Sequence, residues 1–271
     1  MNISISEFKP SSGLQSYIQA YWIAEFNLRA NANFSQSVVP SGCIELIIHQ
    51  TDEHCFLSKN DNNWDKSPAF TLLGLYPKSY DVKFSKKVKT FGIRFYPDGI
   101  RNIFGVPPSE FLATYEASID VLGRDFNDFC ARIRDTEVAE RQVQLVENYL
   151  LKLFSRNSKT YDYTHLAMKL IRQSNGIANY QELTGQIPIS LRQLQREFKN
   201  QYGLTIKDYM RISRLNAIHQ YMQNPNTCLT ELAYQLEFTD QSHFIREYKN
   251  YVGVPPKKFI KEKDKFLVNA V

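Results

Sequence analysis

Side chains able to contact DNA recur at two places near the C-terminal end of the chain. The first set is Arg192, Gln195, Arg196 and Lys199, and the second is Gln241, Ser242, Arg246 and Lys249. Arginine and glutamine form paired hydrogen bonds with base edges in the major groove, and lysine contacts phosphates. The residue types therefore favour nucleic-acid recognition over bond-making chemistry, and no catalytic residue is assigned.

Two short helices must carry these side chains. The first copy begins at Ser190 and ends at Gly203, and the second, fifty positions later, begins at Asp240 and ends at Gly253. Serine or aspartate before a helix and glycine after it are its usual start and stop signals. Apolar residues recur at four-residue steps opposite the polar face, which predicts one buried stripe on each helix: Leu194, Phe198 and Tyr202, matched by Phe244, Tyr248 and Val252.

The repeat extends upstream of both copies, where an apolar pattern predicts a helix and a tight turn before each one. This order is helix-turn-helix architecture, in which the first helix supports the second. Residues 207–222 are periodic and predict a linker helix between the two units. Two rigidly spaced recognition helices would enter successive major-groove segments about 34 Å apart. An exposed arginine alone is usually only solvated surface, but the duplication of the whole unit favours a function.

A set of residues between positions 163 and 260 forms a recognisable pattern. Its members are chiefly Leu232, Ala233, Phe238, Asp240, Gln241, Ser242, His243, Phe244, Arg246, Tyr248, Lys249, Gly253, Pro255 and Phe259, with Leu194, Arg196, Phe198, Gly203, Tyr209, Arg214 and Ala217. By these residues the C-terminal part of the chain resembles the AraC/XylS family of bacterial transcription regulators.

The resemblance implies base contacts from the first helix through Arg192, Gln195 and Arg196, and from the second through Gln241, Ser242 and Arg246. It also implies RNA polymerase as a partner. Glu237 stands where the family usually has a turn glycine, with Pro188 at the matching place in the first helix-turn-helix unit.

The charge distribution agrees with a C-terminal DNA-binding part. Residues 160–271 hold 15 lysines and arginines against 10 aspartates and glutamates, and the whole chain holds 33 against 28. The basic excess of the chain thus lies entirely in this part, as phosphate binding requires. The lysines between Lys257 and Lys265 either contact phosphates or form a solvated terminus.

Length and composition predict two domains with a connection between them. We expect a β-rich regulatory or effector domain over 1–108, a helical connector over 109–155, and the DNA-binding domain over 160–271, with a polar linker at 155–160. No segment has the roughly 18 consecutive apolar residues of a membrane span, and no signal peptide is visible. The four scattered cysteines indicate reduced thiols. These features predict a cytoplasmic protein without membrane partner or cofactor.

The first hundred residues predict β structure, so the fold class is α+β. Short runs rich in β-formers alternate with turn residues, which favours an antiparallel sheet or a small barrel. We also expect a helix from Leu14 to Trp22, from the spacing of its apolar residues. The segments Tyr21–Trp22, Pro40–Leu46 and Gly92–Gly99 resemble an N-terminal domain found on some family members. The predicted strands cover Cys43–His49, Phe70–Leu75, Tyr80–Phe84 and Thr90–Tyr96.

Two charged residues stand among apolar neighbours in this region. Glu45 and Arg94 either form a salt bridge between neighbouring strands or face an interior where they bind a small-molecule effector. Tyr76, Tyr80 and Tyr96 would line such a pocket, or else belong to the core.

The nearest approach to a metal site in the sequence is a group of histidines and cysteines. His49, His54 and Cys55 lie close together, with Cys43 upstream. Their separation does not match an established ligand spacing, so no metal is expected.

Residues 107–154 have helical periodicity throughout. One apolar stripe consists of Val143, Val146, Leu150 and Leu153. It can pack on a second copy of the chain or on its own β domain. A homodimer is slightly favoured, because two copies would double the DNA contacts.

Together the patterns predict a sequence-specific DNA-binding transcription regulator with two recognition helices. Its N-terminal domain would bind a small-molecule effector or mediate dimerisation. One alternative is a small barrel enzyme with a helical appendage, which would need converging His and carboxylate residues that the sequence lacks. The other is a helical protein-interaction adaptor, whose exposed faces should carry aromatic or leucine anchors in place of Arg, Gln, Ser and Lys.

Overall fold

The computed structural model describes residues 2–28, 34–60, 63–157, 163–222, 224 and 227–268. The chain divides into two compact units. Unit 1 comprises Met1–Ser35, Cys43–Leu75 and Asp81–Thr160. Unit 2 comprises Gln36–Gly42, Tyr76–Tyr80 and Tyr161–Val271. Two short segments from the first part of the sequence thus belong to the unit that carries the repeated helices.

Unit 1 contains an open six-stranded sheet. Its strand order is β1-β2-β9-β4-β7-β10, and every neighbouring pair is antiparallel. β1 and β10 are its two edges, so the six strands do not close into a barrel. Of the two predicted alternatives, the antiparallel sheet is therefore the one present. The strands are β1 Asn2–Phe8, β2 Ile18–Asn27, β9 Lys87–Phe95, β4 Ile44–His49, β7 Phe70–Leu73 and β10 Tyr115–Ala117.

Shorter strands complete the β structure. β5 (Cys55–Asn60) pairs antiparallel with β6 (Asn63–Lys66) and with β8 (Tyr80–Phe84). In unit 2, the end of β3 (Phe34–Val38) pairs parallel with β11 (Phe266–Leu267). The four predicted strands are confirmed as β4, β7, β8 and β9, with ends that differ by up to three residues.

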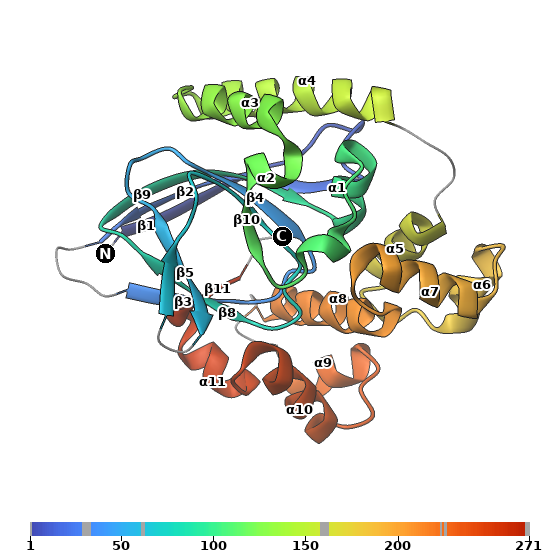
Figure 1. The fold of residues 1–271 in the computed structure, drawn as a ribbon. Helices are drawn as coiled ribbons and strands as arrows, with labels where there is room; N and C mark the ends of the chain where they lie inside the picture. The colour runs from blue at the N-terminus through green and yellow to red at the C-terminus, as the bar shows by residue number, and fades with distance from the viewer. Residues whose placement is uncertain are drawn as a thin grey trace. The chain divides into compact units, whose positions relative to one another are not determined.

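The two faces of the six-stranded sheet differ in character because side chains alternate along each strand. One face carries apolar side chains such as Leu46 and Ile93, which are fully buried. Within unit 1, three helices lie beside this sheet (Figure 1): α1 (Pro97–Phe104), α3 (Arg124–Arg134) and α4 (Ala139–Asn157). Ring contacts from Phe95 on β9 to Phe104 on α1, and from Phe104 to Phe126 on α3, join the sheet to these helices.

The predicted helix at Leu14–Trp22 is wrong. Turns occupy residues 12–17, and Ile18 begins the ten-residue strand β2. β2 pairs with β1 on one side and with β9 on the other. Bonding along both edges of the strand outweighs a helical spacing that covers only nine residues, because aromatic and β-branched residues also suit strands.

The apolar stripe of α4 packs inside its own unit. Val146 and Leu150 are fully buried, and Tyr149 stacks on Phe129 of α3 with ring centroids 4.0 Å apart. Val146 and Leu150 therefore belong to the core of unit 1, as one of the two alternatives predicts, and a homodimer stays a prediction. The region before α4 is also less helical than expected, since it contains the 3₁₀ turn η1 Pro108–Phe111, strand β10 and the short helix α2 Ser118–Leu122. Helix α4 includes the first part of the predicted linker, and residues 158–160 lie outside the described residues.

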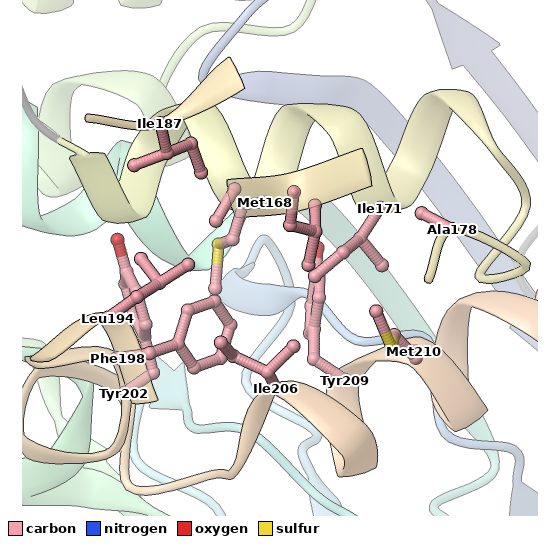
Figure 2. Packing of buried hydrophobic residues seen from close by; sticks show 12 residues of the cluster. Met168, Ile171, Ala178, Ile187, Leu194, Phe198, Tyr202, Ile206, Tyr209 and Met210 are labelled. Atoms are coloured by element: carbon pink, nitrogen blue, oxygen red, sulfur yellow. The ribbon is translucent and has the colours of Figure 1, made fainter. Parts of the chain in front are cut away.

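Unit 2 contains seven α-helices among its described residues, α5 to α11. A first apolar core joins α5, α6, α7 and α8, and Figure 2 shows Met168, Phe198 and Tyr209 pointing toward one another inside it. A second core lies around Leu232, Phe244 and Tyr248. The helices are α5 Tyr163–Gln173, α6 Tyr180–Gln186, α7 Leu191–Tyr202, α8 Ile206–Tyr221, α9 Leu229–Gln235, α10 Gln241–Val252 and α11 Pro256–Lys261, followed by the 3₁₀ turn η2 Lys263–Lys265.

In the part of the chain that is described, no helix is both long and apolar enough to cross a membrane.

Candidate nucleic-acid interface

Helices α7 and α10 begin and end where the sequence predicts. The Ser190 side chain accepts a hydrogen bond from the backbone N–H of Gln193 at 3.2 Å. The Asp240 carboxylate does the same for His243 at 2.7 Å. Both helices are followed by a left-handed glycine, Gly203 with φ 73° and Gly253 with φ 87°. Each helix is therefore a rigid twelve-residue element fixed at both ends.

The two faces of each helix are sharply divided. The stripe residues Leu194, Phe198, Tyr202, Phe244, Tyr248 and Val252 are at most 2% exposed. The eight predicted contact residues are all exposed: Arg192, Gln195, Arg196, Lys199, Gln241, Ser242, Arg246 and Lys249. No hydrogen bond or ion pair ties these eight side chains to the rest of the described chain. The arrangement leaves them available to a partner, and their individual roles stay predictions.

The turn before α10 uses a strained residue. Glu237 adopts φ 55°, a left-handed conformation that glycine accepts without cost. The turn is closed by hydrogen bonds from the Glu237 N–H to Tyr234 O and from the Phe238 N–H to Ala233 O, at 3.0 and 2.9 Å. In the first helix-turn-helix unit, Pro188 stands at the corresponding place, and its turn contains no non-glycine residue with positive φ. Among the described residues, only Ala113, Asn175 and Glu237 are non-glycine residues with positive φ. The two turns thus differ in geometry although the helices match.

Helix α8 belongs to both cores and joins the two helix-turn-helix units. Ile206, Tyr209 and Met210 in its first half lie in the first core. In its second half, the Nε2 atom of buried His219 is 3.0 Å from the hydroxyl of Tyr248 on α10. Burial lowers the pKa of His219 to about 3, so the ring is neutral at physiological pH. α8 therefore fixes the separation of α7 and α10.

Arg214 connects α8 to segments of both helix-turn-helix units. Its Nη2 atom donates to the carbonyl of Gly176, before α6, at 3.1 Å. Its guanidinium also lies 5.1 Å from the ring centroid of Phe238, in the turn before α10. Burial lowers the pKa of this guanidinium below its ordinary value. Gly176 has φ 75°, and a Cβ there would come within 2.1 Å of the Met210 carbonyl. The close approach of this turn to α8 requires glycine.

Further polar contacts of α8 could not be predicted from the sequence. Arg211 forms an ion pair with Glu247 of α10, with 3.0 Å between Nε and Oε1. The repeat shows a glutamate at the matching place in both copies, but spacing alone does not indicate which one pairs. The contact joins two residues that lie 36 positions apart in sequence.

The two early segments of unit 2 contact its helices. The Asn216 side chain on α8 donates to Ser41 O at 2.6 Å, and the Ser79 N–H donates to Tyr251 O at 2.9 Å. Gly42, with φ 68°, packs so closely that a Cβ would lie 2.9 Å from the Ile212 side chain. Both segments lie inside the predicted β-rich domain 1–108, because their local composition resembles that of the strands around them.

Glu45 and Arg94 face each other on neighbouring strands of unit 1. The Arg94 Nε atom donates to Glu45 Oε1 at 2.8 Å, and its Nη1 atom donates to Glu7 at 2.9 Å. Trp22 donates its indole N–H to the second oxygen of Glu45 at 2.6 Å. Arg94 is 4% exposed and Glu45 is 8% exposed. The cross-strand salt bridge is thus present, and a role in effector binding stays a prediction. Tyr76 and Tyr80, whose ring centroids lie 4.2 Å apart, belong to unit 2 and not to the unit of Arg94.

The histidines of unit 1 are held by a serine. The His49 Nε2 atom lies 2.8 Å from the Ser67 hydroxyl, which itself donates to Cys55 O. His54 stacks on His49 with centroids 4.6 Å apart. Burial, followed by the neighbouring His54, lowers the pKa of His49 to about 3. Within the described ranges, no group of three or more His, Cys, Asp or Glu side chains is placed to hold a metal ion.

Two family models match the chain. Residues 183–262 match a helix-turn-helix domain, and residues 6–116 match a domain of unknown function, DUF6597. The first match covers α7 to α11 and the second covers most of the β structure.

The curated relatives are regulators. The Msm operon regulatory protein of Streptococcus mutans is 28% identical over 120 residues, which are 44% of this chain and 43% of that protein. The HTH-type transcriptional activator RhaS of Escherichia coli is 29% identical over 89 residues, which are 33% of this chain and 32% of that protein. The chain therefore matches less than half of the length of either relative.

Among solved structures, ToxT from Vibrio cholerae has a similar fold. One structure of ToxT covers 96% of this chain and 98% of its own, with a TM-score of 0.52 and 10% sequence identity. A second covers 94% and 99%, with a TM-score of 0.50 and 10% identity. At this identity the likeness shows the fold alone.

Proposed function

We propose that the chain is a transcription regulator of the AraC/XylS family, and that it binds specific DNA sequences with two recognition helices. One observation carries the proposal. α7 and α10 each present an exposed polar face above a buried stripe, and both are held by the single helix α8. Solvation alone does not explain why the same polar helix face occurs twice at a fixed separation.

Each helix has a defined role in the proposal. Arg192, Gln195 and Arg196 contact bases in one major-groove segment, through the paired hydrogen bonds that Arg and Gln form with guanine and adenine. Lys199 contacts a phosphate and fixes the register of α7.

On the second helix, Gln241, Ser242 and Arg246 contact bases in the next segment, and Lys249 contacts a phosphate. The first two stand at the start of α10, where backbone N–H groups also favour a phosphate. Arg192, Arg196 and Lys199 correspond in the repeat to Ser242, Arg246 and Lys249, so both helices present the same face to the DNA in this proposal.

The test is selection from a random duplex library with the full-length chain at two salt concentrations. The proposal predicts two enriched sequence elements about one helical turn apart and binding that weakens as salt rises. Salt-sensitive binding without an enriched sequence would reject base recognition. Failure to bind at low salt would reject DNA as the partner and favour the protein-interaction adaptor.

We propose in addition that unit 1 binds a small-molecule effector on the polar face of its six-stranded sheet. The register of β4, β7 and β9 places five polar residues on this face: Glu45, His49, Thr71, Thr90 and Arg94. All five are buried. His49 Nδ1 is buried and has no hydrogen-bond partner among the described residues. Because Ser67 donates elsewhere, His49 Nε2 carries the proton, and Nδ1 is left as an acceptor.

This arrangement favours a ligand that brings donor groups, such as hydroxyls or amines. Titration of polyols and of primary amines into the full-length chain tests this class, with fluorescence of Trp22 as the signal, because its indole N–H bonds Glu45. An unchanged signal across both classes would contradict the proposed ligand chemistry, and a response that persists unaltered in Glu45→Gln would place the ligand elsewhere.

The remaining parts of the proposal concern partners. RNA polymerase is a partner by family resemblance, and in vitro transcription from a selected site measures the effect. A homodimer would need a surface other than the buried stripe of α4, and sedimentation of the full-length chain tests it. A DNA-binding regulator without catalytic activity, located in the cytoplasm, is the form of the protein that these features support.

A further inference from the structure

The polar contacts of α7 and α10 differ although the two helices are copies of one another. On α7, Tyr202 and Gln201 contact Thr164 of α5, a helix that packs in the same apolar core as α7. On α10, Glu247 and Tyr248 contact α8, the helix that joins the units.

The matched glutamates show the difference most clearly. Glu197 on α7 accepts a hydrogen bond from Gln193 of the same helix at 2.8 Å. Glu247 on α10 occupies the corresponding place, fifty positions later, and pairs with Arg211 on α8 at 3.0 Å. A second contact between the same helices is that of His219 on α8 with the Tyr248 hydroxyl on α10, at 3.0 Å. The Arg211–Glu247 pair and this contact attach α10 to α8 at two points, which restrains the rotation of α10 as well as its distance from α8.

We propose that Arg211 and Glu247 are positioning residues that set the angle and separation of α10 relative to α7. The inference rests on the proposed DNA-binding function and specifies how it is tuned. The two residues fix the spacing between the sequence elements that the helices recognise and leave the bases recognised by each helix unchanged. Side chains 32% and 18% exposed place the pair at the edge of the α8–α10 contact, where it can be broken without opening the core.

The alternative is a purely structural role, in which the pair only stabilises the second helix-turn-helix unit. The two readings differ in what they do to DNA. A loss of stability lowers the active fraction and weakens binding to every site by the same factor. Loss of positioning weakens binding to sites with the preferred spacing and favours sites with one base pair more or less.

The experiment compares Glu247→Gln with Glu197→Gln in the full-length chain. The two variants remove the same charge at matched places, so their direct electrostatic effect on phosphate binding is comparable. Each is used in selection from a library in which two fixed elements are separated by a variable spacer. For Glu247→Gln we expect a broadened spacer distribution and about threefold to tenfold weaker binding at the preferred spacer, as for a part-exposed ion pair. For Glu197→Gln the spacer distribution should match that of the wild type.

A double variant tests whether the two residues act through each other. Arg211→Ala combined with Glu247→Gln should broaden the spacer distribution no further than Arg211→Ala alone. An unchanged spacer distribution in Glu247→Gln, or an equal change in Glu197→Gln, would overturn the positioning role while leaving the two-helix function intact. A wild-type chain that selects no pair of elements would instead reject the proposed function on which the inference rests.

Discussion

Acidification should weaken unit 2 through the buried imidazole of His219. The ring is 5% exposed, lies against Tyr248 and Phe259, and has its pKa lowered by burial from 6.5 to about 3. Because the pKa is lower in the folded chain, the unfolded chain takes up a proton first as the pH falls. The stabilisation is therefore complete above pH 6.5 and is lost progressively between pH 6.5 and pH 3.

The size of the effect follows from the two pKa values. Each pH unit below the unfolded pKa costs about 1.4 kcal/mol, so the free energy of unfolding should fall by about 2 kcal/mol at pH 5. This loss should be confined to the part of unit 2 that His219 holds together, namely α8, α10 and α11.

Hydrogen exchange of the full-length chain measures this loss by segment. Peptides from α8 and α10 are compared at pH 7.5 and pH 5.0 after correction for intrinsic exchange. His219→Gln removes the titration and keeps an amide that can bond Tyr248, so its pH dependence should be smaller by about 2 kcal/mol. His49→Gln is the control, since His49 has a similar pKa but lies in unit 1. An equal loss in wild type and His219→Gln would refute the reasoning.

Three further substitutions test the packing. Glu237→Gly should raise the free energy of unfolding of unit 2 by about 1 kcal/mol, because it relieves the left-handed conformation at φ 55°; an unchanged or lower melting temperature would count against this. Gly176→Ala should cost more than about 2 kcal/mol, since its Cβ would collide with the backbone of α8, and a melting temperature equal to that of wild type would show that the turn can move. Arg94→Met should cost about 3–5 kcal/mol by leaving Glu45 buried without its cation. Denaturant unfolding followed by Trp22 fluorescence measures this cost, and a loss below about 1 kcal/mol would mean that water replaces the cation.

Helices α7 and α10 could be predicted because their signals are local. Ser190 and Gly203 delimit α7, and the four-residue spacing of its apolar stripe fixes which face is buried. The second copy repeats the same signals, so each supports the other. Exposure of Arg196 and Arg246 follows directly, since they lie opposite the stripe.

Features that depend on distant partners could not be predicted from the sequence. The residues Ile18–Trp22 fit a helix or a strand by themselves, and the pairing of β2 with β1 and β9 decides for the strand. The stripe of α4 has the same spacing whether it packs on its own unit or on another copy. The partner of Glu247 is likewise invisible in the repeat, because Glu197 has the same neighbours in sequence and a different partner in space.

The central claim, that two helices recognise two separate DNA elements, is tested most directly by Arg196→Ala and Arg246→Ala in the full-length chain. Each variant undergoes the same library selection as the wild type, and each serves as the control for the other. Loss of one arginine should weaken binding by about 1–3 kcal/mol and relax base preference at one position of one element. The account predicts that Arg196→Ala and Arg246→Ala relax different elements, with the other element unchanged. Relaxation of the same element by both variants, or uniform weakening with a smaller salt dependence, would contradict it.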